Sequence, residues 1–258
     1  MASEHDGGVP ELSNWITVLA ERGHDHPVIA WLHHWENLVF AGIIAVALCL
    51  IAWRYGRRPS TVPRGGQNVL ELFVEGLDNA LHRIIGPTWR RHTPFIGTLF
   101  LYIWFMNLSV LIPGMKSSTS SLNTTVALAL VVFGYVQWIG LTSQGPLTYL
   151  DRLAGSPRDV VGWALVPLML PIHVLGELVR PVSLSLRLAF NILAEDMLLA
   201  VMVGLGISLG IAVHLPIGLP LQVLILPLLL IFSTVQALVF SLLSTVYIAL
   251  VSSTEAHH

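Results

Sequence analysis

Charged side chains are scarce in this chain of 258 residues. Asp, Glu, Lys and Arg make up 11% of it, against about 25% in ordinary soluble domains, and this shortage excludes a normal soluble globule. Apolar residues instead make up 54%, and the mean hydropathy is +0.74. Together with several apolar runs of bilayer-spanning length, these values predict an all-α, polytopic membrane protein.

Cysteine is nearly absent. The single Cys49 lies inside an apolar run, so a disulfide framework and a CxxC metal site are both excluded. The net charge of −2 provides no basic excess for binding nucleic acid. The first 36 residues lack the basic start and early apolar core of a cleavable signal, so we expect the internal spans to direct membrane insertion.

Five segments are apolar and long enough to cross a bilayer. They are residues 37–53, 94–112, 122–142, about 160–213 and about 221–250, and a Gly- and Pro-containing break at 214–220 joins the last two. The second and third spans are separated by a short turn-rich loop, which predicts that they form an antiparallel pair.

Residues 67–85 have a different pattern, because their polar side chains fall in one arc of about 80° when drawn as a helix. This pattern predicts an amphipathic helix on the membrane surface. We therefore expect an extramembrane segment (1–36), an integral-membrane domain (37–251) and a tail (252–258).

The Lys and Arg residues predict the orientation of the chain. Seven of them lie between Arg54 and Arg91, whereas one precedes the first span. The positive-inside rule therefore places residues 54–93 and 144–159 in the cytoplasm, with the N-terminus outside and the C-terminus inside.

The segment 160–213 carries ionisable side chains, each of which costs about 2.5–3.5 kcal/mol in a lipid-facing position. At about 100° per residue most of them form one stripe about 33 Å long. The stripe consists of His173, Glu177, Arg180, Arg187, Asn191 and Glu195. Asp196 points elsewhere, and Pro171 and Pro181 are expected to kink the helix and rotate part of the stripe.

The last apolar segment has a polar half made of hydroxyl and amide side chains. These are Ser233, Thr234, Gln236, Ser241, Ser244, Thr245 and Tyr247. They are candidates for lining an aqueous path. The alternative is ordinary helix packing, because Ser and Thr can bond the carbonyl one turn back.

Arg187 is the strongest functional candidate. Arginine stays protonated in proteins, so it is a poor proton carrier and a good fixed positive charge. Such a charge attracts a carboxylate brought to it and repels hydronium or Na⁺, which an ion-driven device needs between two half-length aqueous paths. The alternative is a structural ion pair with Glu177 or Glu195. Arg180 is expected to reach the cytoplasmic interface.

Two motifs resemble subunit a of F-type ATP synthases, the stator subunit beside the rotating ring of c subunits. They are PVSLSLRLAFNILAEDMLLA at 181–200 and TVQALVFSLLSTVYIAL at 234–250. Weaker support comes from 97–114 and 121–130, so the resemblance covers roughly residues 37–250. It implies five spans plus a surface helix, with the last two helices long and strongly tilted against the c-ring.

The resemblance also implies residue roles. Arg187 matches the essential arginine that each c-subunit carboxylate passes as it releases its ion to one half-channel and loads from the other. Asn191 and Gln236 match the polar residues near that arginine, and Glu195 and Asp196 are candidates for ion translocation. Candidate channel-lining residues are His173, Glu177, Ser183, Ser233, Ser244 and Tyr247.

The implied partners are the c-ring, the subunit b peripheral stalk, the other ATP synthase subunits and the lipid bilayer of a bacterial inner membrane. No nucleic acid, metal or cofactor is expected, and the translocated ion is H⁺ or Na⁺. The chain has no nucleotide-binding loop of the G-x-x-x-x-G-K-[ST] kind, so we expect it to be non-catalytic, with nucleotide chemistry in other subunits.

The chain departs from the family pattern at several positions. The family's Phe-Gly after R-L is replaced by Ala189-Phe190, its His or Glu by Leu229, and two acidic residues by Val110 and Ser121. The acidic position five residues after Asn191 is Asp196, so alignment favours Asp196 in the half-channel. The helical phase, which is the direction of each side chain at about 100° per residue, favours Glu195 instead.

Two other functions compete with this one. A stand-alone secondary transporter or channel would use Arg187 as an anionic-substrate site, but the chain has no internal repeat. An intramembrane enzyme lacks support, because no G-x-S-x-G or H-E-x-x-H motif occurs. His24 with His26, His33 with His34, and His257 with His258 are interpreted as solvated histidines rather than metal ligands.

Overall fold

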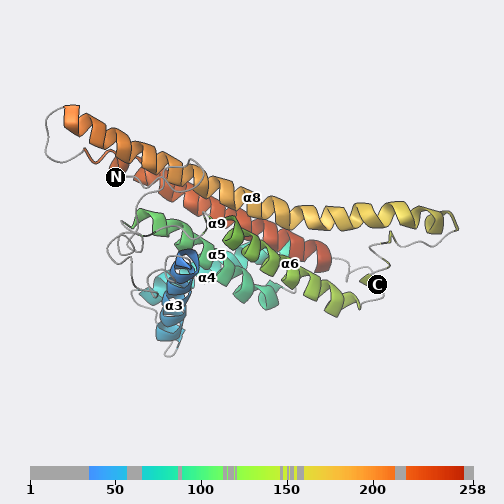
Figure 1. Cartoon of the computed structure of the whole chain (residues 1–258). Coiled ribbons are helices and arrows are strands. Elements are labelled where there is room, and N and C mark those ends of the chain that lie inside the picture. The colour runs from blue at the N-terminus through green and yellow to red at the C-terminus, as the bar shows by residue number, and fades with distance from the viewer. Residues whose placement is uncertain are drawn as a thin grey trace. The chain divides into compact units, whose positions relative to one another are not determined.

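The structure is a computed structural model that describes residues 35–56, 66–86, 89–112, 115, 119, 121–145, 148–149, 151, 154–155, 160–212 and 219–252. Within these ranges the chain is helical and contains no strand. The elements are α3 (Glu36–Gly56), α4 (Gly66–Ile85), α5 (Trp89–Leu108), the 3₁₀ turn η1 (Ser109–Leu111), α6 (Leu122–Gln144), α8 (Val160–Ala212) and α9 (Gln222–Ser252) (Figure 1). The expected all-α class is therefore confirmed.

Five helices are long and apolar enough to cross a membrane: α3, α5 with η1, α6, α8 and α9. Helix α4 is different, because Leu81 is fully buried whereas Glu71, Glu75 and His82 are exposed. The prediction of five spans and one amphipathic helix is thus confirmed. The expected segment 1–36 lies, up to residue 34, outside the described residues, as do 253–258 and most of the break at 214–220.

Two helices differ in detail from what hydropathy indicates. Helix α5 begins at Trp89 rather than at Pro94, because its polar first turn is rich in Arg, which favours helix but lowers hydropathy. Helix α8 continues through Pro167, Pro171 and Pro181. Each proline removes a single backbone hydrogen bond, which one long helix tolerates when the rest of the ladder is intact. The rotation of the stripe stays a prediction.

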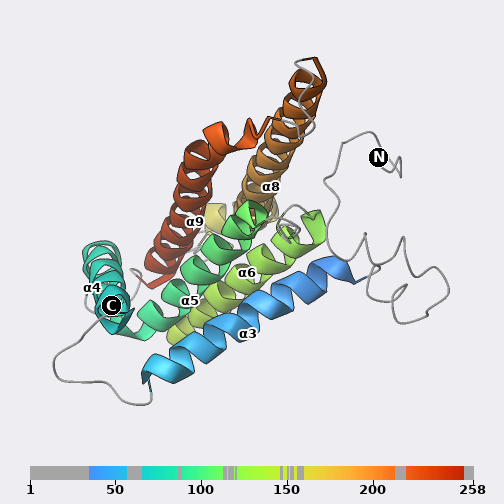
Figure 2. The same cartoon turned by 90° about the vertical axis from the view of Figure 1, so that its left-hand side faces the viewer.

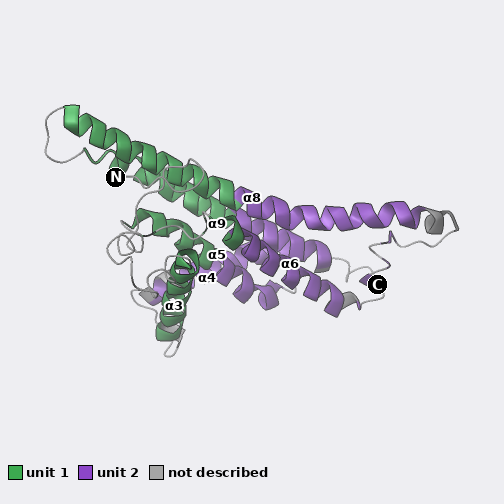
Figure 3. Ribbon diagram, in the orientation of Figure 1, with its two compact units in different colours: residues 1–60, 100–124, 188–238 green, residues 61–99, 125–187, 239–258 purple. Residues whose placement is uncertain are grey.

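The chain forms two compact units (Figure 3). Unit 1 comprises Met1–Ser60, Phe100–Thr124 and Leu188–Leu238, and unit 2 comprises Thr61–Leu99, Thr125–Arg187 and Val239–His258. Both long helices, α8 and α9, contribute to both units. The polar stripe of the sequence is therefore divided between them, and each part is described within its own unit.

Among the described residues of unit 1, two groups of buried apolar side chains pack together. In the first, Ala41 and Ile44 of α3 are buried with Met106 of α5, and the Tyr102 hydroxyl donates to the Ala41 carbonyl at 3.4 Å. Figure 2 shows the helices α3 and α5 that carry these residues. In the second, Leu199 of α8 is buried with Ile225 and Leu229 of α9. Leu229 is fully buried there, so the position at which the family commonly has His or Glu completes an apolar contact in this chain.

Unit 2 joins α4, the start of α5 and α6. The rings of Phe95 and Tyr135 stack with their centroids 3.8 Å apart, and Tyr135 also hydrogen-bonds His92 at 3.1 Å. Thr93 donates to the Asp78 carboxylate on α4 at 2.8 Å. Because the first turns of α5 contact the C-terminal half of α6, the expected antiparallel pair is confirmed in this unit.

In unit 1, Gly206 of α8 contacts Leu219, which lies just before the start of α9. The Leu219 amide donates to the Gly206 carbonyl at 2.9 Å, and a Cβ on Gly206 would lie 2.1 Å from the Leu219 carbonyl oxygen. Gly206→Ala is therefore expected to lower the stability of the purified chain in detergent by about 1–3 kcal/mol, because backbone must move. Gly204→Ala is the matched control, since nothing lies within 4 Å of its Cβ. Equal melting temperatures for the two variants would contradict this prediction.

Candidate functional site

Glu195 is the centre of a buried polar cluster in unit 1. Its side chain is 3% exposed. Asn191, one turn earlier on α8, donates to Oε1 at 2.7 Å, and Ser233 of α9 donates to Oε2 at 3.0 Å. Within the described part of unit 1 no cation pairs with this carboxylate. Both of its oxygens are thus satisfied by neutral donors, and a carboxyl group held in this way can exchange a proton without breaking an ion pair.

The structure selects Glu195 over Asp196 for this cluster. Consecutive residues on a helix point about 100° apart, so the two carboxylates cannot share one face while α8 stays regular. Glu195 is buried against Ser233, whereas Asp196 is only half-buried. The buried carboxylate is therefore the one that helical phase favours, while the assignment of the half-channel to Glu195 or Asp196 stays a prediction.

Asn107 extends the cluster and was missed by the sequence analysis. It is fully buried, its Oδ1 accepts a hydrogen bond from Thr119 at 2.9 Å, and its Nδ2 donates to the Ser233 carbonyl at 3.5 Å. Nearby, the Trp104 indole donates to the Thr234 hydroxyl at 2.9 Å. The available signal was an amide inside an apolar span, where a polar group must find a partner.

Gln236 lies one turn after Ser233 on α9 and is 6% exposed. Its Nε2 is buried and has no hydrogen-bond partner among the described residues. Leaving a buried amide donor unsatisfied costs about 1–3 kcal/mol. This side chain therefore offers a donor to an acceptor that none of the described residues supplies.

Arg187 is exposed at the end of unit 2. Among the described residues of that unit it makes no ion pair with Glu177, whose carboxylate bonds other partners. Leu186, the preceding residue, is exposed, and so are Val182, five positions earlier, and Ser183, one turn earlier. A fixed positive charge in an apolar exposed surface is available to an anionic group from outside the chain.

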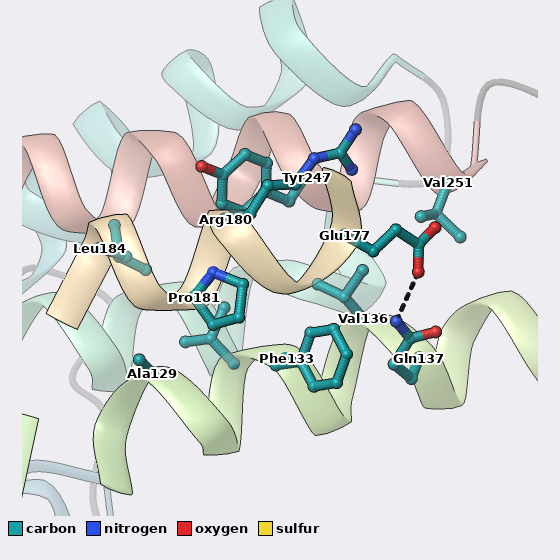
Figure 4. Close-up of a pocket in the computed structure, with 11 residues that line it drawn as sticks. Ala129, Phe133, Val136, Gln137, Glu177, Arg180, Pro181, Leu184, Tyr247 and Val251 are labelled. Carbon is teal, nitrogen blue, oxygen red and sulfur yellow. Dashed lines mark hydrogen bonds between the residues drawn. The ribbon is translucent and has the colours of Figure 1, made fainter. Parts of the chain in front are cut away.

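The remaining candidates of unit 2 form a second polar group. The Glu177 carboxylate accepts from Gln137 at 2.7 Å, and the Tyr149 hydroxyl lies 2.8 Å from the same oxygen. The Arg180 guanidinium lies over the ring of Tyr247, 5.4 Å from its centroid. Arg180 is half-buried, and its charge is placed against an aromatic face (Figure 4). Its position at the cytoplasmic interface stays a prediction.

Two candidates have only local contacts. The buried Ser244 hydroxyl donates to the Phe240 carbonyl at 2.8 Å, which is the helix-packing alternative. His173 is exposed, and its Nδ1 lies 3.0 Å from the Met169 carbonyl. The part of the chain that the structure describes contains no group of three or more potential metal ligands. The paired histidines of the termini and His214 lie outside it.

Comparison with known proteins gives consistent matches. Residues 38–249 match the family described as ATP synthase A chain. The chain is 41% identical over 242 residues to ATP synthase subunit a of Protochlamydia amoebophila, covering 94% of this chain and 89% of that protein. It is 36% identical to the subunit a of Moorella thermoacetica, covering 83% and 89%, and 35% identical to that of Helicobacter pylori strain G27, covering 88% and 93%.

Proposed function

This chain belongs to the ATP synthase subunit a family, and we propose that it forms two aqueous half-channels against the c-ring, so that ion flow turns the ring and drives ATP synthesis. The observation that carries this proposal is the buried Glu195, held only by neutral donors, beside a Gln236 amide with an unsatisfied donor. Such an arrangement supports ion transfer better than a purely structural role, because a structural carboxylate is normally paired with a cation.

Arg187 would separate the two half-channels. A c-subunit carboxylate that approaches Arg187 is favoured in its charged form, so it gives up its ion before it passes. The same fixed charge repels hydronium or Na⁺ and prevents a leak between the paths. Asn191, Glu195, Asp196 and Gln236 would serve the half-channel beyond Arg187, with Ser183 and the hydroxyls of α9 along the aqueous surface.

The remaining parts of the proposal concern partners and place. The chain would bind the c-ring and the subunit b stalk in a bacterial inner membrane, with its N-terminus outside and its C-terminus in the cytoplasm. Nucleotide chemistry would take place in other subunits, and this chain would need no cofactor. The ion, H⁺ or Na⁺, would be selected by ligands on the c subunits.

Disulfide cross-linking tests the contact with the c-ring. In a Cys49→Ser background, Phe190→Cys and Ala189→Cys form a matched pair, because Phe190 is 62% exposed and Ala189 is 4% exposed. With a cysteine beside the mid-span carboxylate of a co-expressed c subunit, we expect position 190 to cross-link and position 189 not to. The link should stop ATP-driven ion pumping until it is reduced. Absence of a link at position 190, with solute movement by this chain alone in liposomes, would favour the stand-alone transporter instead.

A further inference from the structure

The junction between α4 and α5 in unit 2 carries a group of basic side chains that the proposed function does not use. His82 and Arg83 lie in the last turn of α4, and Arg90 and Arg91 lie in the first turn of α5. All four side chains are exposed. The sequence contains no Asp or Glu at positions 79–150, so no acidic residue of the junction itself offsets these charges.

A tight turn brings the two helix ends together. Gly86 has a φ of +81°, a left-handed conformation that glycine adopts without a side-chain clash. Its amide donates to the His82 carbonyl at 3.2 Å, and its carbonyl accepts from the Trp89 amide at 3.2 Å. The rings of His82 and Trp89 meet edge to face with their centroids 5.8 Å apart. The last turn of α4 therefore lies against the first turn of α5.

Packing behind the turn holds the junction in place. Leu81 of α4 is fully buried, and a Cβ on Gly97 of α5 would lie 3.0 Å from Leu77 Cδ2. Thr93 of α5 donates to the Asp78 carboxylate at 2.8 Å. Asp78 is the acidic residue closest to the junction in the sequence, and it thus bonds a neutral hydroxyl and no arginine of the described chain.

The Arg90 guanidinium is oriented but not neutralised. Its Cζ lies over the Trp89 ring, 5.1 Å from the ring centroid. The guanidinium makes no ion pair or hydrogen bond with a residue that the structure describes. Stacking on an aromatic face leaves the N–H groups at the edge of the guanidinium free, and two of them can bind one phosphate together. The positive end of the α5 dipole makes this charge more unfavourable unless an anion binds there.

The length of the following span places this junction at the depth of the lipid headgroups. The apolar span that begins at the junction is Trp89–Leu111, with 23 residues. At about 1.5 Å per residue it exceeds the hydrocarbon thickness of about 30 Å, so its arginine-rich first turn reaches the headgroup layer. Ile84 and Pro94 are exposed next to the charged turns. The surface therefore combines positive charge with apolar contacts, which is the combination that a phospholipid offers in reverse.

We propose that this junction is a binding site for the headgroup of an anionic phospholipid such as phosphatidylglycerol. Arg90 holds the phosphate, Arg83 and Arg91 add positive charge nearby, and the acyl chains lie along the apolar surface of α5. A zwitterionic lipid brings a cation of its own to the same arginines and binds less well. Free phosphate lacks the apolar contacts, so the site commits to lipid.

Photo-crosslinking tests the site in the assembled complex that contains this chain. The complex is placed in phosphatidylcholine vesicles with a small fraction of photoactivatable phosphatidylglycerol or phosphatidylcholine, and labelled peptides are quantified by mass spectrometry. We expect phosphatidylglycerol to label residues 66–99 more strongly. Arg90→Gln should lower this labelling about fivefold, and Arg83→Gln with Arg90→Gln about 25-fold, because each basic side chain near an anionic surface contributes about 1 kcal/mol. Arg54→Gln, at an exposed position of α3, is the matched control and should not change it.

Three results would overturn the proposal. Equal labelling of the junction by the two lipids would show that its charge does not select a headgroup. Equal losses in Arg54→Gln and Arg90→Gln would indicate only the general attraction of a basic surface. If inorganic phosphate displaces the probe, or if Arg90→Gln instead releases another subunit from the complex, the junction binds a free anion or a protein and not a lipid.

Discussion

Replacing Arg187 with glutamine is expected to abolish ion-coupled ATP synthesis while the complex still assembles. Two unit charges about 4 Å apart interact by about 4 kcal/mol at the effective dielectric constant of about 20 that fits protein sites. Because each 1.36 kcal/mol changes a rate about tenfold, loss of this attraction corresponds to about a thousandfold lower rate. Glutamine keeps hydrogen-bonding capacity and similar length but carries no charge.

Assembly is expected to survive because of where Arg187 lies. Its side chain is exposed, and within the described part of unit 2 it holds no carboxylate, so its removal leaves no buried charge unpaired there. Breaking a buried ion pair typically costs 3–5 kcal/mol, and the exposed position avoids that penalty. The variant should therefore separate coupling from folding.

The measurement is ATP synthesis by vesicles under an imposed ion gradient, divided by the amount of assembled complex on immunoblots. Arg187→Lys keeps the charge but loses the planar guanidinium, so a partial rate would show that charge and geometry both contribute. Leu186→Met, at the neighbouring exposed position, should leave coupling intact. Coupled synthesis at the normal rate in Arg187→Gln would contradict the assigned role.

The architecture was predictable because lipid imposes simple rules. Backbone groups in hydrocarbon must bond within a helix or a closed barrel, so long apolar runs indicate helical spans directly. The amphipathic helix at 67–85 followed from the 3.6-residue period in the same way. A prediction based on hydropathy alone misses the polar end of a helix, and the first turn of α5 is an example.

The candidate site was predictable only along single helices. The stripe on α8 and the choice of Glu195 follow from helical phase, which depends on local sequence alone. The partners of Glu177 were not predictable, because Gln137 precedes it by 40 positions on another helix and Tyr149 lies in a helical turn after α6. Such contacts depend on how helices pack, and a single sequence contains no direct record of that packing.

Glu195→Gln is expected to lower ion flux about a hundredfold without loss of stability. The amide has the shape of the carboxylate, so Asn191 can still donate to its oxygen, and the Ser233 hydroxyl can accept from its nitrogen. The cluster remains satisfied, but the side chain can no longer exchange a proton. Asp196→Asn is expected to lower the flux less than Glu195→Gln does, because Asp196 is half-buried and the Asn191 and Ser233 donors bond Glu195 instead.

Ser233→Ala provides the complementary result, because it removes a donor and leaves the carboxylate. Ser233 is fully buried, and its loss leaves one Glu195 oxygen unsatisfied at a cost of about 1–3 kcal/mol. This variant should therefore melt at a lower temperature while it retains part of the ion flux. Ser244→Ala is the control, since that equally buried hydroxyl bonds only a backbone carbonyl of its own helix and its loss should cost less.

Ion flux and melting temperature, measured on the same four variants, distinguish a functional carboxylate from a structural one. If Glu195 transfers ions, flux is lost in Glu195→Gln alone and stability falls mainly in Ser233→Ala. If the cluster only packs α8 against α9, ion flux and melting temperature fall together in both Glu195→Gln and Ser233→Ala. Loss of flux in Asp196→Asn with normal flux in Glu195→Gln would instead assign the half-channel to the residue that alignment favours. Helical phase would then have placed the buried carboxylate correctly but the ion path wrongly.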